Sequence, residues 1–301
     1  MHRPNIMDNQ INIQLNKLFG YKVLTSTLIG GYSKRVWEIQ TDSHKYVIKL
    51  LEGQSEKDLL HHHAEVAFSS IVNSTGVLET VKFISDTKGD TIHRIDKNRN
   101  DYFVVIESHP IIKKTNLNSE EQQELGHLMS VLHAKLKGFA HPGLGNTKYM
   151  REVNTDEMKL IIEAFPDAGY KNYLKFMQPL DYQALDLKTT VIHGDWHQAN
   201  MSFTQPPFIF DLDTIAWGAR VEELARTLTH WWVDPSEVKD LYRNLIIGYA
   251  TLTQSEIDII PSLIIAQQYR KYAEYRGYKD PINAERVKES IPVLKSLFSL
   301  S

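Results

Sequence analysis

The residues best placed to do chemistry in this chain of 301 residues form one short stretch, His193 to Asn200. It contains Asp195 and, five residues later, Asn200. Eleven residues after that Asn, Asp211 ends the apolar run 208–210. Phosphoryl transfer from a nucleotide needs a carboxylate that receives the proton of the attacking hydroxyl, together with oxygen ligands for magnesium. The spacing predicts Asp195 as the catalytic base and Asn200 and Asp211 as ligands of Mg²⁺.

Two alternatives accompany this prediction. Asp and Asn favour turns, so each residue taken alone would be expected only to shape a loop. The joint occurrence of two such elements, each behind an apolar run, favours the chemical interpretation. Asp213 also competes with Asp211 for the principal metal position. We place Asp211 first because it directly follows the apolar run, which leaves Asp213 as a second ligand or as a residue that faces the substrate.

A lysine within the predicted strand 46–51, Lys49, is suited to bind nucleotide phosphates. Glu65 follows 16 residues later, in the middle of a predicted helix over 56–74, where it can hold the lysine by an ion pair. A solvated strand lysine is the alternative. The glycine turn before the strand and the central glutamate of the helix favour the ion pair.

Further nucleotide contacts are expected at two turns of the chain. Gly30, Gly31 and Ser33 lie between the first two predicted strands, and such a loop can cover phosphates with backbone N–H groups and a hydroxyl. A Gly-Gly pair is also an ordinary hairpin turn, and it lacks the G-x-G-x-x-G spacing. Glu107 and His109 follow the last predicted strand of this region, where an adenine ring would find backbone donors and acceptors.

The elements that must position these residues change character along the chain. Residues 21–107 show strand-like alternation with turn residues between the runs, interrupted by the one helix over 56–74. From Ser119 onward apolar residues recur at helical spacing, with helices predicted over 119–132, 156–165, 171–177, 220–232, 238–251, 255–276 and 284–297. A further strand is predicted at 81–84. This pattern predicts an α+β chain with an antiparallel-sheet lobe over 1–107 and a mostly helical lobe over 108–301.

Composition restricts the remaining possibilities. The chain is 42% hydrophobic and 24% charged, as in ordinary globular proteins, and its formal net charge of −3 gives no general reason to bind nucleic acid or anionic membranes. Without any cysteine it can form neither disulfides nor thiolate sites. No apolar run approaches the roughly 20 residues of a membrane helix, and the N-terminus lacks the apolar core of a signal peptide. A cytoplasmic protein of undetermined oligomeric state is expected.

Substrate contacts are harder to place. Candidates are His197 beside the predicted base, Asp213, and residues of the aromatic-rich C-terminal half, for which we choose Trp231, Tyr269 and Arg270. At helical spacing such aromatic residues are more often core than pocket. A cationic acceptor would need acidic residues near the base, with Asp213, Glu222 and Glu223 as candidates, whereas Arg270 and Arg276 would suit a carboxylate-bearing acceptor. The run His61–His63 is expected to be solvated or partly packed, since consecutive helical residues point in different directions.

The catalytic stretch resembles the aminoglycoside phosphotransferase and choline kinase superfamily. Gly194 stands where eukaryotic-like protein kinases carry Arg, and His197 follows two residues after the Asp. Further matching features are the Gly30-Gly31 turn, Lys49, Glu65, the helix Leu125–His133, Phe210–Asp213, Gly218 and Glu223–Ala225. The resemblance covers roughly residues 20 to 230 and, beyond them, weakly suggests the branch of homoserine kinase-like and antibiotic kinases. Glu223 departs from it, because the family usually has Asp there.

This resemblance implies a two-lobed protein-kinase-like fold and Mg²⁺-dependent phosphorylation of a small-molecule hydroxyl by ATP or GTP. It implies the same roles for Asp195, Asn200, Asp211, Lys49 and Glu65 as the residues themselves suggest. The leading hypothesis is a kinase for an antibiotic, of the aminoglycoside type or related, or for an amino alcohol; homoserine, choline and sugars are alternative acceptors. A scaffold without activity, like the spore-coat relatives, is disfavoured by the intact motifs. Protein substrates are disfavoured because only six residues separate Asp211 from Gly218.

Overall fold

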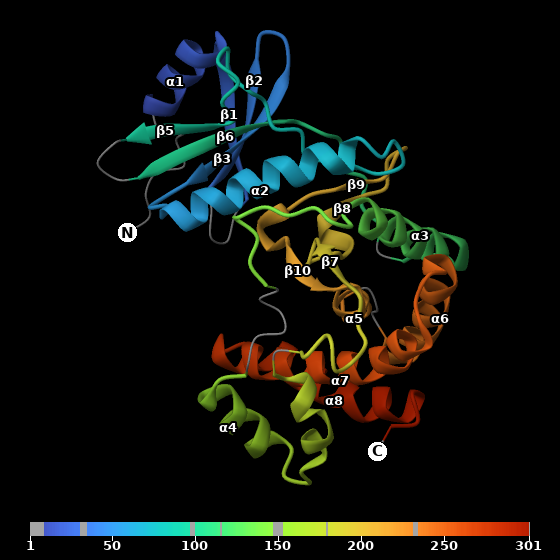
Figure 1. Cartoon of the computed structure of the whole chain (residues 1–301). Helices are drawn as coiled ribbons and strands as arrows, with labels where there is room; N and C mark the ends of the chain where they lie inside the picture. Colours follow the sequence, from blue (N-terminus) through green and yellow to red (C-terminus); the bar gives the residue numbers. More distant parts are fainter. Residues whose placement is uncertain are drawn as a thin grey trace. The chain divides into compact units, whose positions relative to one another are not determined.

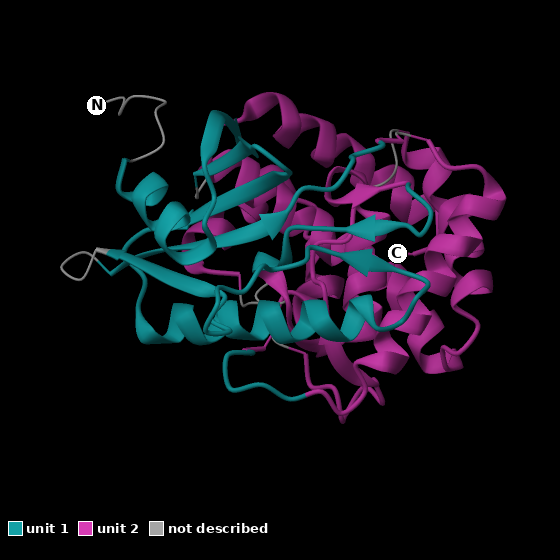
Figure 2. Ribbon diagram, turned by 90° about the horizontal axis from the view of Figure 1, so that it is seen from above, with its two compact units in different colours: residues 1–112, 140–144, 204–213 teal, residues 113–139, 145–203, 214–301 magenta. Residues whose placement is uncertain are grey.

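The computed structural model describes residues 9–30, 35–96, 100–114, 116–146, 153–178, 180–230 and 234–300. The chain forms two compact units, which Figure 2 distinguishes by colour. Unit 1 comprises residues 1–112, 140–144 and 204–213, and unit 2 comprises 113–139, 145–203 and 214–301. Unit 1 therefore extends past the predicted lobe of residues 1–107 and takes in two segments from later in the chain.

Unit 1 is built on an antiparallel sheet of five strands in the order β1-β2-β3-β6-β5. Their bounds are β1 Val23–Gly30, β2 Val36–Thr41, β3 Lys45–Leu51, β5 Ile92–Asp96 and β6 Asp101–Glu107. The meander arises because alternating side chains along β2 and β3 are buried, as in Trp37 and Ile39. This confirms the predicted antiparallel sheet.

Two helices cover the two faces of this sheet (Figure 1). Helix α1, Asn9–Phe19, places Ile11 and Leu15 against a core that includes Trp37, Ile48 and Phe103. Helix α2, Glu56–Asn73, begins with a capping box between Ser55 and Asp58. Because successive strand residues point to opposite faces, Lys49 points away from the α1 core, toward α2.

A short parallel pair joins early and late segments of unit 1, since β4, Glu79–Thr80, pairs with β9, Phe208–Ile209. The Thr80 hydroxyl donates to the Ile209 carbonyl at 2.7 Å. The strand predicted at 81–84 is wrong in extent, because only an isolated bridge from Phe83 to Ile106 forms there. The pairing places the segment with Asp211 and Asp213 in the same unit as the sheet.

Unit 2 contains an antiparallel ribbon of β7, Thr189–Ile192, and β10, Ala216–Ala219, with Val191 opposite Trp217. The chain leaves β7 directly into the stretch 193–200, which ends in the 3₁₀ turn Gln198–Asn200 before β8, Met201–Ser202. Helix α5, Arg220–Leu228, starts immediately after β10. The predicted catalytic stretch therefore leaves the ribbon beside Ala216, and α5 starts at the opposite end, beside Thr189.

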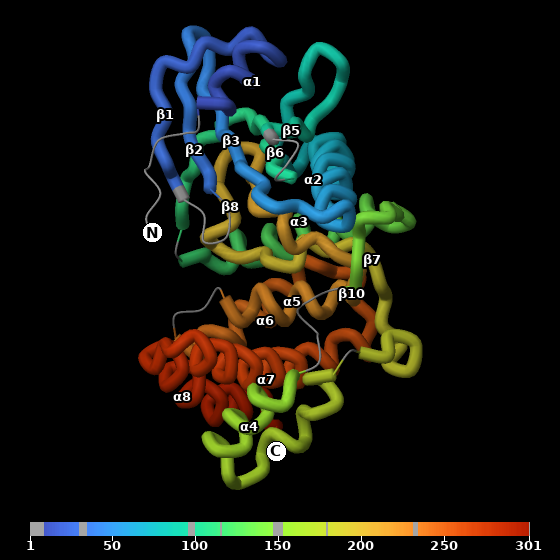
Figure 3. Tube along the Cα trace, turned by 90° about the vertical axis from the view of Figure 1, so that its left-hand side faces the viewer, coloured from blue at the N-terminus to red at the C-terminus, as the bar shows by residue number. Residues whose placement is uncertain are grey.

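The remaining helices of unit 2 confirm its predicted helical character. They are α3 Ser119–Lys135, α4 Thr155–Ala164, α6 Val238–Tyr249, α7 Gln254–Gly277 and α8 Pro281–Leu297, where α7 and α8 lie side by side (Figures 1 and 3). Asn118, Asn154 and Thr253 cap three of them through capping boxes. The helix predicted over 171–177 is instead the 3₁₀ segment Gly169–Phe176. Helix α5 ends at Leu228 because the Thr229 hydroxyl bonds the Arg226 carbonyl.

Helices α3 and α6 approach each other so closely that two glycines are required. A Cβ on Gly126 would lie 2.3 Å from the carbonyl oxygen of Leu245, and one on Gly248 would lie 1.8 Å from that of Gln123. Both obstacles are backbone, which cannot rotate away. This contact fixes α3, which carries a residue that supports the catalytic stretch. Among the described helices, none combines the length and apolar character needed to cross a membrane.

Candidate active site

A buried carboxylate, that of Glu223, holds the backbone of the stretch 193–200. Gly194, at φ +79°, donates its N–H to Glu223 Oε1 at 2.6 Å. Glu223 Oε2 lies 2.6 Å from His133 Nε2, and His133 Nδ1 lies 2.6 Å from the Tyr249 hydroxyl. Because a carboxylate can only accept, the proton of the imidazole is on Nε2. Glu223, at the position where the family usually has Asp, thus connects α3, α5 and α6 to the loop.

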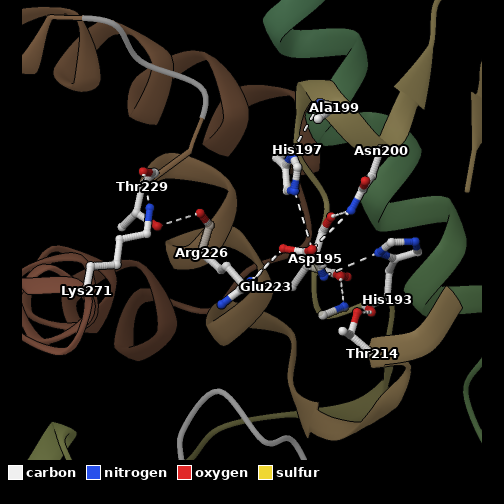
Figure 4. Close-up of polar contacts among 11 residues, drawn as sticks. His193, Asp195, His197, Ala199, Asn200, Thr214, Glu223, Arg226, Thr229 and Lys271 are labelled. Carbon is white, nitrogen blue, oxygen red and sulfur yellow. Dashed lines mark hydrogen bonds and ion pairs between the residues drawn. The ribbon is translucent and has the colours of Figure 1, made fainter. Parts of the chain in front are cut away.

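The carboxylate of Asp195 is held by three side chains (Figure 4). Arg226 donates to Asp195 Oδ1 from Nε at 3.0 Å and from Nη2 at 2.8 Å. On the other oxygen, His197 Nε2 lies at 3.3 Å and Asn200 Nδ2 at 3.1 Å. Burial alone would raise the pKa of Asp195, but the hydrogen bond from His197 and the charge of Arg226 hold it well below its usual range. The carboxylate is therefore ionised and fixed in direction.

The two histidines of this stretch act as hydrogen-bonding groups. His197 Nδ1 accepts the Ala199 N–H at 3.1 Å, so its proton lies on Nε2, which points at Asp195. His193 Nδ1 lies 3.3 Å from the Asp195 backbone nitrogen, and its carbonyl accepts the Thr214 hydroxyl at 2.8 Å. Both residues shape the loop, and His197 also touches the predicted base.

Asn200 is oriented so that one side of its amide stays available. Its Nδ2 donates to the backbone oxygen of Asp195 at 3.0 Å as well as to the carboxylate. This commits the nitrogen and turns the amide oxygen elsewhere, where it accepts no hydrogen bond from a described residue. An oxygen of this kind suits magnesium.

In unit 1, Lys49 lies between two carboxylates. Its Nζ is 3.7 Å from Glu65 Oε2 and also forms an ion pair with Asp213. Burial lowers the pKa of Lys49, but the charges of Glu65 and Asp213 outweigh it and raise that pKa above its usual value. Glu65 is 2% exposed and is held further by His62 Nδ1 at 2.8 Å. The structure thus brings together the lysine and glutamate that the sequence paired.

The histidine run on α2 has structural partners. His62 bonds Glu65 and, through Nε2, lies 3.1 Å from Gln54 Oε1. His61 reaches the backbone oxygens of Gly143, at 3.3 Å, and Asp213, at 3.1 Å. His61 thereby connects α2 to two of the late segments of unit 1.

Asp211 and Asp213 differ in conformation and in contacts. Asp211 has φ +64°, a left-handed conformation that costs a non-glycine residue free energy, and its side chain is exposed. Asp213 instead faces Lys49. Asp186 is also exposed and has a positive φ, so the conformation does not select a ligand, and Asp211 as the principal metal ligand stays a prediction.

The donor chemistry of the chain fits a magnesium ion held mainly by substrate. Among the described residues, no group of three or more His, Asp and Glu side chains is arranged to hold a metal on its own. Magnesium commonly takes only one or two side-chain ligands and completes its shell with phosphates and water. Asn200 and Asp211 offer one oxygen ligand each of the required type.

A hollow of about 760 Å³ lies in unit 1 where β6 ends, lined among others by Tyr46, Glu107, Ser108 and His109. Its size is in the range of ligand pockets. The His109 ring stacks on Phe208 with centroids 3.9 Å apart, and burial lowers the pKa of His109. Glu107 and His109, predicted to contact the nucleotide base, thus border a hollow of suitable size.

Other predicted contacts have different surroundings. Tyr269 is 1% exposed and packs against Phe165 and Tyr173, so it belongs to the core and is not available to a ligand. Arg270 Nη2 donates to the Phe176 carbonyl at 3.1 Å. Gly30 ends β1, whereas Gly31, Ser33 and Trp231 lie outside the described residues.

Two of the three acidic residues suggested for a cationic acceptor, Glu222 and Glu223, are also unavailable. Glu222 is 2% exposed and accepts from the Ala219 N–H and the Tyr182 hydroxyl. Burial raises its pKa to about 7. Glu223 is 1% exposed and holds the catalytic stretch. Neither residue offers an exposed charge to a substrate.

Arg226 is the site residue that the sequence analysis missed. It follows Glu223 by three residues and lies on the same side of α5, so that one helix face supports both the loop backbone and the aspartate. The signal was present in the sequence, because the Glu-Leu-Ala segment that carries the resemblance is followed directly by this Arg.

Comparison with known proteins agrees with this geometry. The chain matches the phosphotransferase enzyme family (APH) over residues 25–255. A search of curated proteins returned no sequence match.

Among solved structures, the chain is similar to amicoumacin kinase hAmiN in complex with AMP-PNP, Ca²⁺ and Ami, with a TM-score of 0.73, 15% identity and coverage of 95% of this chain and 93% of that one. It is also similar to the microcompartment-associated aminopropanol kinase, with a TM-score of 0.64, 13% identity and coverage of 97% of each chain. The likeness to choline kinase LicA from Streptococcus pneumoniae has a TM-score of 0.59, 14% identity and coverage of 94% of this chain and 98% of that one.

These likenesses confirm the predicted protein-kinase-like fold, with an antiparallel sheet early in the chain and helices later. The family match covers the catalytic stretch, the Lys49–Glu65 pair and α5. The resemblance seen in the sequence is confirmed: the chain belongs to the phosphotransferase enzyme family and is a small-molecule phosphotransferase.

Proposed function

We propose that the chain transfers the γ-phosphoryl group of ATP to a hydroxyl group of a small molecule. The observation that carries the proposal is the Asp195 carboxylate, which Arg226, His197 and Asn200 fix in one direction beside the end of β7. Enzymes catalyse phosphoryl transfer mainly by positioning the reactants and stabilising charge, and a fixed carboxylate can position the attacking hydroxyl.

In the proposed reaction a bond forms between the acceptor oxygen and the γ-phosphorus while the bond from that phosphorus to the β-phosphate oxygen breaks. ADP leaves, and the hydroxyl proton passes to Asp195. Because the pKa of Asp195 is held low, the residue is a weak base, and orienting the hydroxyl is its larger contribution. Arg226 acts through Asp195 and is a positioning residue.

The nucleotide is assigned to residues of matching charge. Lys49, held in its charged form, would bind phosphate oxygens, and Glu65 would keep the lysine in place. A magnesium ion would supply positive charge that offsets the negative charge of the phosphates. Asn200 and Asp211 are the side chains that we assign to it. ATP as donor is supported by AMP-PNP in the amicoumacin kinase complex.

The acceptors expected from the sequence are an antibiotic or an amino alcohol. The likeness to amicoumacin kinase and to aminopropanol kinase supports both classes. A polycationic aminoglycoside is less favoured, because Glu222 and Glu223 are buried and committed to the protein. A scaffold without activity is disfavoured, since Lys49, Asp195 and Asp211 keep the charges and conformations that the reaction requires.

The test is an ADP-release assay with ATP or GTP over a panel of antibiotics, amino alcohols, homoserine, choline and sugars. The Asp195→Ala variant should still gain thermal stability from Mg·ATP but should lose about 10²–10⁴-fold in turnover. Full turnover by that variant would remove Asp195 from the mechanism. If no acceptor raises ADP release and nucleotide leaves the Tm unchanged, the scaffold hypothesis is correct.

A further inference from the structure

A lysine near the catalytic aspartate has no acidic partner. Lys271 on α7 donates from Nζ to the Thr229 carbonyl at 2.8 Å, and no carboxylate of a described residue lies within ion-pair distance of it. Figure 4 shows it beside the turn that follows Arg226 on α5. Burial and the neighbouring charge of Arg226 lower its pKa to about 7, against weaker opposite effects of Glu274 and Asp195. A buried amine in this position gains from any anion that approaches it.

Apart from Asp195 and Glu274, the groups that act on Lys271 are neutral or cationic. The His230 ring stacks on His197 with centroids 5.0 Å apart. Burial, followed by the charges of Lys271 and Arg226, holds the pKa of His230 well below its usual value, so this ring is neutral. Its Nε2 is buried without a hydrogen-bond partner among the described residues.

A second polar side chain on the same helix is also left unsatisfied. Gln268 lies one turn before Lys271 on α7 and is 1% exposed, and neither atom of its amide has a partner in the described part of the chain. A buried polar group without a partner costs about 1–3 kcal/mol. Gln268 on α7 and His230 after α5 therefore both carry unused hydrogen-bonding capacity in the described part of the chain.

Three carboxylates on α5 and α7 are committed to the protein. Glu222 and Glu223 have the buried partners described above, and Glu256 is paired with Arg220 and caps α7. An ammonium group arriving here would meet the positive charges of Arg226 and Lys271, opposed by the negative charges of Asp195 and the exposed Glu274. An anionic group would instead complete the ion pair that Lys271 lacks.

From this arrangement we propose that Lys271 binds a carboxylate of the phosphoryl acceptor, so that the acceptor is a hydroxy acid such as a hydroxy amino acid. The inference rests on the proposed kinase function and narrows its acceptor. It keeps the amino-alcohol unit and adds a negative charge to it. Lys271 then selects among hydroxyl compounds, while Asp195 orients the hydroxyl that reacts.

Pairs of compounds that differ only in the carboxylate test this directly. Homoserine and 3-amino-1-propanol, serine and ethanolamine, and threonine and 1-amino-2-propanol are each related by loss of that group. Phosphorylation with ATP and Mg²⁺ is measured for both members, and binding to the nucleotide-bound protein is measured by calorimetry. The carboxylate-bearing member of at least one pair should bind and turn over better by about 100-fold or more.

Variants of Lys271 locate the effect. Lys271→Met should lower kcat/KM for the preferred carboxylate by about 100-fold and reduce the preference between the two members of the pair. Lys271→Arg keeps the charge and should retain most of the preference. The matched control is Lys239→Met, an exposed lysine on α6, which should behave as the wild type. A Tm shift with Mg·ATP in each variant verifies that the protein is folded.

The inference is overturned if the amino alcohol is the better member of every pair, or if no carboxylate member either binds or turns over. It is also overturned if Lys271→Met keeps the full preference. Failure of the kinase function itself has a different signature, because then no compound of either kind is phosphorylated and Asp195→Ala has no effect on ADP release. The two failures are therefore distinguishable in one set of assays.

Discussion

The two charged groups assigned to the chemistry are held in opposite ways. In unit 1 a single cation, Lys49, lies against two carboxylates, Glu65 and Asp213. In unit 2 a single carboxylate, Asp195, receives hydrogen bonds from three side chains, of which Arg226 donates twice. In both units the functional group has more than one partner of the opposite kind. Lys49 has two acids, and Asp195 has several hydrogen-bond donors.

This difference shows how each unit fixes a charge. The excess acid raises the pKa of Lys49 against the effect of burial, and the excess donors lower that of Asp195 against the same effect. Neither group changes protonation near neutral pH. Both remain partly accessible, with 13% of the Lys49 and 17% of the Asp195 side chain exposed, whereas Glu65 is 2% exposed. Lys49 and Asp195 are thus both more accessible than the buried Glu65.

The largest effect is expected from removing the cation of unit 1. Lys49→Met leaves Glu65 buried without its main partner, and loss of one member of a buried pair costs about 3 kcal/mol of unfolding free energy. Turnover should also fall about 10²–10³-fold, because a stabilising charge on the phosphates is lost. Urea unfolding and ADP release measure the two effects.

The control for this prediction is Lys82→Met, which removes an exposed pair with Glu79 at 3.7 Å. Exposed pairs contribute about 0–1 kcal/mol, so this variant should stay close to the wild type. An equally small effect for Lys49→Met would mean that the Lys49–Glu65 pair does not organise unit 1.

The second effect concerns the cation of unit 2. Arg226→Gln should raise the pKa of Asp195, because burial then acts with less opposition. The wild-type carboxylate stays ionised above its lowered pKa, so the acid limb of the pH–rate profile should move to higher pH in the variant. Loss of positioning should reduce kcat by about 10²-fold at neutral pH, with a smaller change in the KM for ATP.

Arg243→Gln serves as the control for Arg226, since Arg243 forms an exposed i,i+3 pair with Asp240. Arg226→Lys restores the charge but not the two donors from one guanidinium, and it should recover the pH profile more than kcat. An unchanged acid limb in Arg226→Gln would contradict the assigned role.

The contrast between these two sites also shows what sequence could and could not predict. Lys49 with Glu65, and Asp195 with Asn200, lie on adjacent or single elements, so their spacing alone indicates that they meet. Arg226 comes 31 residues after Asp195. It reaches the aspartate only because β10 pairs with β7 and delivers α5 to the loop, a non-local contact that periodicity does not show.

The acceptor residues were the weakest prediction for a related reason. Helical spacing marks Tyr269 as facing the protein, but it does not tell a pocket wall from the core, and this ring lies in the core. The same holds for Glu222 and Glu223, whose burial follows from the packing of α5 against β10 and α7. The fold and the catalytic loop were predictable from local pattern, whereas the direction of side chains on packed helices was not.

A smaller effect on stability and turnover is expected from changing Glu223, which bonds the backbone of the stretch 193–200. Glu223→Asp shortens the side chain, so that one carboxylate no longer reaches both the Gly194 N–H and His133 Nε2. We expect a loss of about 1–2 kcal/mol in unfolding free energy and a moderate decrease in kcat. Glu237→Asp, at an exposed glutamate, is the control. If Glu223→Asp has the stability and kcat of the wild type, the aspartate common in the family supports the loop equally well.

The last prediction concerns stability at high pH alone and compares Asp195 with Glu222, which forms no ion pair with a described residue. Among the described residues, Glu222 accepts hydrogen bonds from the Ala219 N–H and the Tyr182 hydroxyl, and burial raises its pKa to about 7. A raised pKa means that its contribution to stability is complete below the ordinary value of about 4.5 and is lost as the pH rises through 7. Glu222→Gln should therefore be more stable than the wild type at pH 8, by roughly 1–3 kcal/mol, and similar to it at pH 5. Urea unfolding at both pH values measures this, and an equal difference at the two would show that Glu222, like Asp195, stays ionised throughout.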